Sequence, residues 1–239
     1  MNSTKRLSRE EQLAYEFACH WRDEMHRPDL ETIDWLRFAN LLTHNRMAVL
    51  AMQVIARTNP IIPTEAQKLI REQAEKYERS ASKLGNALTT YLIAAEAREI
   101  QTVVLKGLWL CEKVYQVPSM RPGGDIDILV RQTDVDASLQ LLAEQGIGEF
   151  WPNLLKDEYF SRHHLHQQRS TADLNIWFEI HWALDHPYTL LTVDYESIFK
   201  RARPGQLLGA PLQEMSLPDV LLSLAIHIVK HAVYPPSLL

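Results

Sequence analysis

The sequence has few cysteines, few glycines and no excess of positive charge. Its 2 cysteines among 239 residues, Cys19 and Cys111, are too few for a disulfide framework and form no zinc-binding CxxC pattern. Only 8 glycines stand against 12 prolines, which favours long helices over flexible loops. With 25 Lys and Arg against 30 Asp and Glu, the chain carries a net charge of −5. This balance argues against a protein whose main task is to grip a nucleic-acid backbone, although it leaves a local basic groove open.

A long apolar run is also missing. The N-terminal stretch Met1–Ser8 has no apolar core that would serve as a signal peptide. The longest run, Val220 to Val229, is about half of the roughly 20 residues that a membrane-spanning helix needs. A composition of 46% hydrophobic and 23% charged residues excludes a disordered or fibrous chain. We therefore expect a soluble, cytoplasmic protein without a membrane partner.

The spacing of apolar residues predicts three regions. In residues 1–99, apolar residues recur at helical spacing, and this region is expected to include a long helix from Thr64 to near Glu99. Such periodicity carries no chemistry, so the plainest interpretation of this region is helical packing and binding of a protein partner. Residues 100–204 alternate strand and helix patterns, which predicts a small α/β core, and residues 205–239 are expected to be a helical segment with a final helix from Pro218.

Within the core, strand patterns alternate with helical ones. A β-branched run over 102–105 predicts a buried strand, and the alternation over 125–130 predicts another. Between them, residues 108–115 have helical spacing, and Thr133 is expected to cap a helix that stops at Gly146. Residues 159–168 and 174–182 are the two candidate strands of a hairpin.

The most informative stretch contains two carboxylates, Asp125 and Asp127. Successive side chains of a strand point to opposite faces, so these two share a face, with Cα atoms roughly 6.5–7 Å apart. Two carboxylates at this spacing repel one another unless a cation lies between them, and Mg²⁺ suits such oxygen ligands. Gly123 and Gly124 would permit positive φ and a close backbone approach to a ligand. A solvent-facing acidic edge is the alternative interpretation.

Two further patterns strengthen the metal interpretation. Lys106 and Gly107 follow the first strand, where a helix start would aim backbone N–H groups at an anion; a surface lysine is the alternative. Alternation over 177–182 places Glu179 and His181 on one face, while Phe178 and its alternate neighbours pack inward. A glutamate in so apolar a strand is costly unless it is paired or binds a metal. A solvent-side glutamate on an amphipathic strand is the other interpretation.

Taken in order, these motifs resemble the uncharacterised nucleotidyltransferases, relatives of the DNA polymerase β-type nucleotidyltransferase superfamily. The resemblance covers roughly residues 80–235. It is carried by Leu105-Lys106-Gly107, Arg121-x-x-Gly124-Asp125-Ile126-Asp127-Ile128-Leu129-Val130, Glu179-Ile180-His181-Trp182 and Leu224-x-x-His227-x-x-x-His231. It implies an α+β fold, with a mixed sheet core between a helical N-terminal region and a helical C-terminal segment.

The resemblance also implies a chemistry. The carboxylates Asp125, Asp127 and Glu179 would be catalytic and would hold two Mg²⁺ ions, or Mn²⁺ in their place. An NTP such as ATP would donate its NMP group to a hydroxyl-bearing acceptor (a small molecule, a protein side chain or an RNA end) and release pyrophosphate. The expected nucleotide and phosphate contacts are Lys106, Gly107, Arg121, Gly124, His181 and His231. The family usually has a pair of small residues at this helix start, but here the second position is Leu108. Arg121 is explained equally well as a residue that ties down the turn.

Several histidines invite other interpretations. His163, His164 and His166 suggest zinc, but neighbouring strand residues face opposite ways, so at most two would converge from this strand. Zinc requires three or four ligands and no cysteine lies nearby, so one of these histidines is instead expected to line the cleft and contact phosphate or the acceptor. His227 and His231 share a helix face without an acidic partner between them, so packing against the core is the commoner outcome. Because family members continue with further helices, the sequence is expected to be either a piece of a longer protein or a short member.

Two rival functions stay open at this stage. One is a toxin-like nucleotidyltransferase that modifies tRNA and is restrained by an antitoxin. The other is a catalytically degenerate scaffold whose helical N-terminal region binds a protein partner, in which case the carboxylates would be dispensable.

Overall fold

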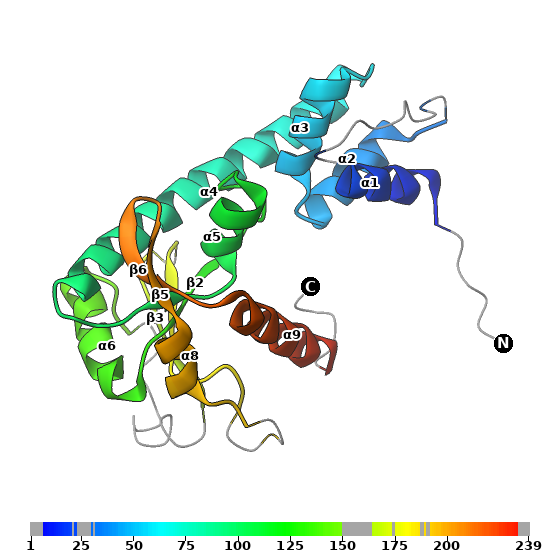
Figure 1. Cartoon of the computed structure of the whole chain (residues 1–239). Helices are drawn as coiled ribbons and strands as arrows, with labels where there is room; N and C mark the ends of the chain where they lie inside the picture. Colours follow the sequence, from blue (N-terminus) through cyan, green and yellow to red (C-terminus); the bar gives the residue numbers. More distant parts are fainter. Residues whose placement is uncertain are drawn as a thin grey trace. The chain divides into compact units, whose positions relative to one another are not determined.

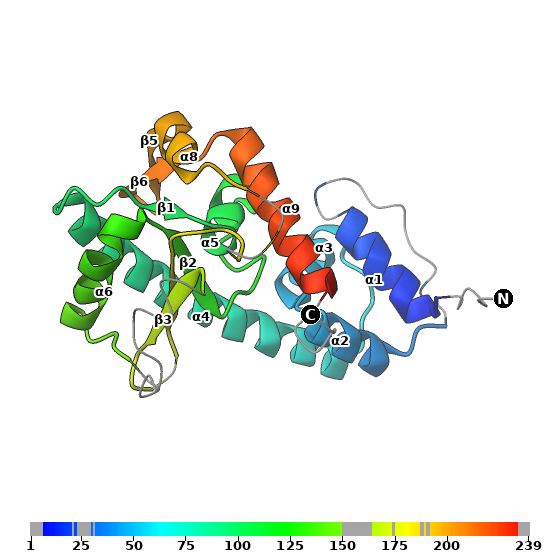
Figure 2. The same cartoon turned by 90° about the horizontal axis from the view of Figure 1, so that it is seen from below.

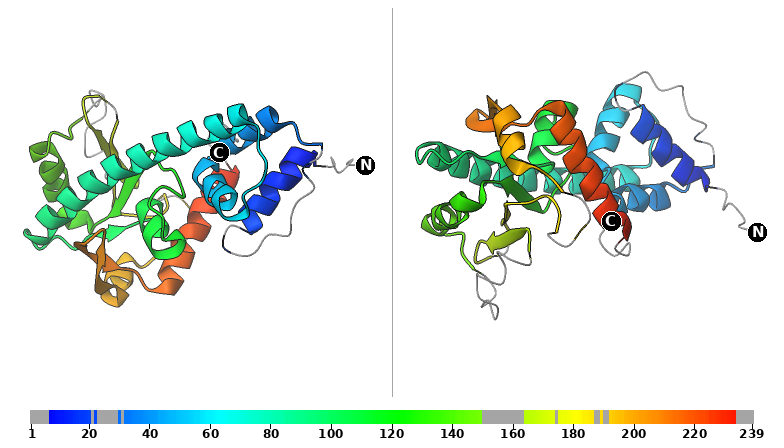
Figure 3. Two further views of the ribbon diagram at one scale, coloured as in Figure 1. Left: turned by 90° about the horizontal axis from the view of Figure 1, so that it is seen from above. Right: turned by 60° about the horizontal axis from the view of Figure 1, so that its bottom comes forward.

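The computed structural model describes residues 7–20, 22, 30, 32–149, 164–173, 175–186, 189 and 192–233. The chain divides into two compact units, Met1–Ser82 with Val117–Pro122, and Lys83–Gln116 with Gly123–Leu239. The long helix α4 (Thr64–Glu96) contributes to both units and is drawn as one continuous ribbon in Figure 3. The domain boundaries predicted after residues 99 and 204 stay predictions.

The first unit is helical in its described part and is shown at the blue end of Figure 1. Ser8 starts the first helix through a capping box. The Ser8 hydroxyl accepts a hydrogen bond from the Glu11 backbone N–H, and the Ser8 backbone N–H donates to the Glu11 carboxylate. Asp34 caps the second helix, and Asn59 ends the third in the left-handed conformation. Besides the start of α4, the unit contains α1 (Arg9–Cys19), α2 (Trp35–His44) and α3 (Ala48–Thr58).

The second unit is built on a four-stranded mixed sheet in the order β1-β2-β4-β3. Strands β2 and β4 run parallel, whereas β1 and β3 each pair antiparallel with a neighbour. The strands are β1 (Val103–Val104), β2 (Asp125–Leu129), β3 (His166–Ser170) and β4 (Trp177–His181). The predicted α+β class with a mixed sheet is therefore confirmed. The first part of the strand predicted over 159–168 lies outside the described residues.

One face of this sheet carries a large hydrophobic cluster of the unit. Ile126, Phe178 and Ile180 are at most 2% exposed and pack against the C-terminal half of α4 and against α6 (Val135–Glu144). Figure 2 shows α6 and α4 beside the strands. Tyr91 of α4 contacts the Phe178 ring at 5.7 Å between centroids. Side chains on the other face of β2 and β4 are thereby held at fixed positions.

Shorter elements complete the unit. A one-turn helix α5 (Gly107–Leu110) continues into a π-helical turn over 111–115, as the spacing of 108–115 predicts. Helix α8 (Tyr195–Arg201) precedes α9 (Leu217–Val233), which includes the helix expected from Pro218. No described helix combines the length and apolar character that crossing a membrane requires.

Two local predictions need correction. The stretch 205–239 does not begin as helix, because β5 (Arg203–Leu207) and β6 (Ala210–Glu214) form a hairpin before α9. Its turn depends on positive φ at Leu208 and Gly209. Thr133 is not the cap of α6 either: it lies in a 3₁₀ turn, and the helix begins two residues later at Val135.

Candidate functional site

Three carboxylates meet on the polar face of the sheet. Asp127 of β2 is directly opposite Glu179 of β4 in the parallel register, and Asp125 lies two residues before Asp127 on the same face. One oxygen from each of the three carboxylates lies within 4.8 Å of the others. Asp127 is the most enclosed, with only 2% of the residue exposed. The structure thus brings together the three residues predicted as catalytic and metal-binding.

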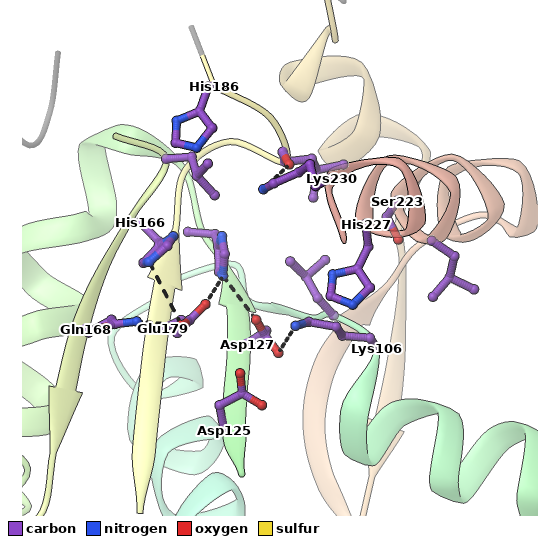
Figure 4. A pocket seen from close by; sticks show the side chains of 15 residues that line it. Lys106, Asp125, Asp127, His166, Gln168, Glu179, His186, Ser223, His227 and Lys230 are labelled. Carbon is purple, nitrogen blue, oxygen red and sulfur yellow. Dashed lines mark hydrogen bonds and ion pairs between the residues drawn. The ribbon is translucent and has the colours of Figure 1, made fainter. Parts of the chain in front are cut away.

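Two basic side chains contact the buried Asp127 carboxylate, and Figure 4 shows the ion pair with one of them, Lys106. The Lys106 ammonium lies 3.1 Å from its Oδ2. The imidazole Nε2 of His181 lies 3.2 Å from Asp127 Oδ1 and also 3.2 Å from Glu179 Oε2. The predicted sites Lys106 and His181 therefore lie in the cluster, where they offset part of its negative charge.

The backbone at Lys106 is strained. Its φ of +34° with ψ of −132° is a conformation that only glycine adopts readily. The next residue, Gly107, also has positive φ, +36°, and starts α5. This tight turn directs the lysine side chain back towards β2, where its ammonium meets Asp127.

The ionisation of the cluster follows from burial and charge. Burial and the neighbouring Asp127 raise the pKa of Asp125. Burial alone would also raise the pKa of Glu179, but the hydrogen bond from His181 and the nearby imidazoles lower it overall, so this carboxylate is ionised at neutral pH. Burial opposes protonation of His181, but its hydrogen bonds to Asp127 and Glu179 raise its pKa.

Strand β3 adds two polar side chains to the site: Gln168, which the sequence did not predict, and His166, one of the three histidines from which a cleft contact was expected. Gln168 pairs with Glu179 in the antiparallel register, and its amide donates to Glu179 Oε1 at 2.7 Å. His166 pairs with His181, and its Nε2 lies 3.9 Å from the same oxygen. Burial lowers the pKa of His166 to about 4, so its ring is neutral at pH 7. The alternation of residues in β3 predicts which side chains share a face of that strand. Only the pairing of β3 with β4 shows which of them lie opposite Glu179.

These groups line a cavity of about 440 Å³ whose opposite wall comes from α9. Lys230 donates to the carbonyl of Leu184 at 3.3 Å, and burial lowers its pKa. Figure 4 shows His227 and Lys230 on the α9 side, across from the strands that carry the carboxylates. The lining residues are Leu105, Lys106, Asp125, Asp127, Leu165, His166, Gln168, Glu179, His181, Leu184, His186, Ser223, Leu224, His227 and Lys230. The cavity therefore joins an anionic wall to a wall with basic side chains.

The other predicted contacts have different places. Gly107 starts α5 beside Lys106, but Gly107, Arg121 and Gly124 are not among the described residues that line the cavity. Arg121 belongs to the first compact unit. Gly123 and Gly124 do not use the positive φ that glycine permits, whereas Gly107 does. His231 lies on α9, but its side chain is outside the described part of the chain.

The carboxylate cluster fits a divalent cation. Mg²⁺ takes oxygen ligands and is usually held by one or two carboxylates together with substrate phosphates. Asp125, Asp127 and Glu179 provide those oxygens on one face of two paired strands, next to a cavity that could receive the phosphates. Burial and the negative charge of Asp127 raise the pKa of Asp125, and a bound cation would offset both effects.

Fold and site together define an α+β protein with a carboxylate triad suited to divalent cations, on a mixed sheet beside a cavity. Residues 31–238 match the model of the uncharacterised nucleotidyltransferase family, and the chain belongs to that family. The predicted family is thereby confirmed. Neither the curated proteins nor the solved structures contain a match to this chain.

Proposed function

We propose that the protein is a Mg²⁺-dependent nucleotidyltransferase that moves the NMP group of an NTP to a hydroxyl-bearing acceptor and releases pyrophosphate. The observation that carries this proposal is the register of β2 and β4, which sets Asp127 opposite Glu179 with Asp125 on the same face. Membership of the nucleotidyltransferase family supports it. Two ions, Mg²⁺ or Mn²⁺, are the proposed cofactor.

In this proposal the three carboxylates hold the cations. When bound, such cations polarise the α-phosphate of the NTP and offset its charge. Asp127 and Glu179 are held in position by neighbouring side chains, since Lys106, His181 and Gln168 contact their oxygens. This support keeps the carboxylates oriented before substrate arrives, which reduces the reorganisation needed for transfer.

The basic side chains have a separate role in phosphate binding. Lys106 lies next to the carboxylates, and Lys230 and His227 line the α9 side of the cavity. A triphosphate placed between the two walls would meet cationic groups on both sides of its phosphates. Glu179, ionised at neutral pH, is the proposed acceptor of the hydroxyl proton as the acceptor oxygen attacks the α-phosphate.

The direct test is transfer of label from each [α-³²P]NTP with Mg²⁺, using the protein itself, RNA and hydroxyl-bearing small molecules as acceptors. Pyrophosphate release measures turnover when the acceptor is unidentified. We expect wild type to release pyrophosphate and the double variant Asp125→Asn/Asp127→Asn to lose it. Glu72→Gln, on an exposed ion pair of α4, is the matched control. If wild type neither binds an NTP nor releases pyrophosphate with any acceptor class, the proposal fails.

A further inference from the structure

A second group of ligand atoms lies beside the three carboxylates. One atom each from His166, Glu179 and His181 lies within 4.8 Å of the other two. The residues come from β3 and β4, where His166 pairs with His181 across the antiparallel register. Their ring centroids are 4.8 Å apart. The sequence alone disfavours zinc here, because at most two histidines converge from one strand and no cysteine lies nearby. The pairing of two strands supplies two imidazoles and a carboxylate.

The distances within this group suit one ion. Metal bonds to nitrogen or carboxylate oxygen of roughly 2.0–2.2 Å place neighbouring ligand atoms about 3–3.5 Å apart, and somewhat further at wider angles. Glu179 Oε2 lies 3.2 Å from His181 Nε2, and Glu179 Oε1 lies 3.9 Å from His166 Nε2. Asp127 Oδ1, also 3.2 Å from His181 Nε2, is available as a fourth ligand.

The ligand types distinguish this group from the carboxylate triad. Two imidazoles and one carboxylate are the set that suits zinc, manganese and iron(II), whereas Mg²⁺ prefers oxygen alone. His181 is 7% exposed, and its Nδ1 is buried with no hydrogen-bond partner among the described residues. The ring is therefore held mainly through Nε2, the atom that faces Glu179 and Asp127.

We propose that His166, Glu179 and His181 form a second cation site that takes a nitrogen-binding divalent metal such as Mn²⁺ or Zn²⁺. Glu179 belongs to this site and to the triad, so the inference extends the proposed function to a mixed pair of ions. One ion is held by oxygen from Asp125 and Asp127, and the other by nitrogen from His166 and His181. Mn²⁺ would then fill both positions, whereas Mg²⁺ would bind the second more weakly than the first.

Electron paramagnetic resonance of chelator-stripped protein loaded with Mn²⁺ alone tests the site. Pulsed measurements detect ¹⁴N nuclei bound to Mn²⁺, and ¹⁵N-histidine labelling assigns them to imidazole. We expect histidine nitrogen coupling in wild type and a loss of coupling in both His166→Gln and His181→Gln. The Mn²⁺ affinity of each variant should fall at least about tenfold. His44→Gln, on the exposed end of α2, is the control and should match wild type.

No histidine coupling in wild type, or undiminished coupling and affinity in both variants, would overturn the proposal. Circular dichroism checks that the variants fold, and His166 is the safer position because its side chain is 26% exposed. Asp125→Asn separates this inference from the proposed function, since Asp125 is outside the histidine group. It should lose binding of Mg²⁺ with NTP but keep the nitrogen-bound Mn²⁺. An NTP-binding wild type without nitrogen coupling refutes the second site alone.

Discussion

The two faces of the paired strands β2 and β4 differ sharply in polarity where the carboxylates lie. On one face, Ile126, Phe178 and Ile180 are buried among apolar side chains of α4 and α6. On the other face, Asp125, Asp127 and Glu179 converge beside a cavity. The same ten residues supply both faces by simple alternation. The apolar face stabilises the fold, whereas the polar face concentrates negative charge that only cations can fully offset.

The apolar face explains how the fold tolerates three carboxylates so close together on the polar face. Three carboxylates held this close repel one another, and burial adds to the cost of their charge. Lys106 and His181 contact Asp127 and compensate part of it, while burial and the charge of Asp127 still raise the pKa of Asp125. The stability of the apolar face therefore keeps in place a cluster that would be unfavourable by itself.

The largest expected effect is on the apolar face. Phe178→Ala should lower the free energy of unfolding by about 3–5 kcal/mol, because it leaves a cavity against Tyr91 in the core. Urea denaturation followed by circular dichroism measures this loss. The neighbouring Trp177→Ala, on the opposite face, is the comparison and should cost less. Equal or greater destabilisation by Trp177→Ala would refute the assignment of the faces.

The next effect is on ligand binding at the polar face. In wild type, Mg²⁺ with NTP at 100 times its Kd should stabilise the fold by about 2.7 kcal/mol. For a chain of this size, a gain of this amount in the free energy of unfolding raises the melting temperature by about 5–10 °C. Asp125→Asn should abolish this rise, and Glu72→Gln on α4 should retain it. A full ligand-induced rise in Asp125→Asn would show that the carboxylate has no part in binding.

In the absence of ligand, the same variant Asp125→Asn should be more stable than wild type. Burial and Asp127 raise the pKa of Asp125, so its ionised form opposes folding at neutral pH. Asp125→Asn should therefore stabilise the metal-free protein and raise its melting temperature above that of wild type. Differential scanning calorimetry in the presence of a chelator measures the change. A lower melting temperature than wild type would contradict the account of charge repulsion.

The smallest effect is the pH dependence of the metal-free protein. The folded state raises the pKa of His181 above its ordinary value of 6.5 through hydrogen bonds to Asp127 and Glu179. Its stabilising contribution is thus fully present below pH 6.5 and is lost as the pH rises through the folded pKa. We expect the melting temperature with chelator to decline above pH 6.5, and His181→Gln to flatten that decline. An equally steep decline in His181→Gln would exclude this imidazole as the source.

Much of the polar face could be predicted because alternation fixes which residues share a face. Asp125 with Asp127, and Glu179 with His181, follow from their spacing alone. Register does not follow in this way: that Asp127 faces Glu179, and that Gln168 and His166 face β4, depends on long-range pairing of three strands. Local alternation carries no information about those partners.

Features that depend on unusual backbone or distant packing were also beyond the sequence. Lys106 adopts positive φ although lysine rarely does, while Gly123 and Gly124, which permit it, do not. The β5–β6 hairpin was missed because its turn begins at Leu208, another residue that seldom takes positive φ. Contributions of α9 to the cavity, such as His227, depend on how that helix packs, which helical spacing alone does not specify.

The most direct test of the central claim is a crystal structure with Mn²⁺ and a non-hydrolysable NTP analogue, using anomalous scattering to locate the metal. The account predicts Mn²⁺ bound at the carboxylates of Asp125, Asp127 and Glu179, with a second Mn²⁺ peak near His166 and His181 if the further site exists, and triphosphate density reaching towards Lys106 and Lys230. The account would be contradicted if the nucleotide bound away from this cavity and no Mn²⁺ were found at the three carboxylates.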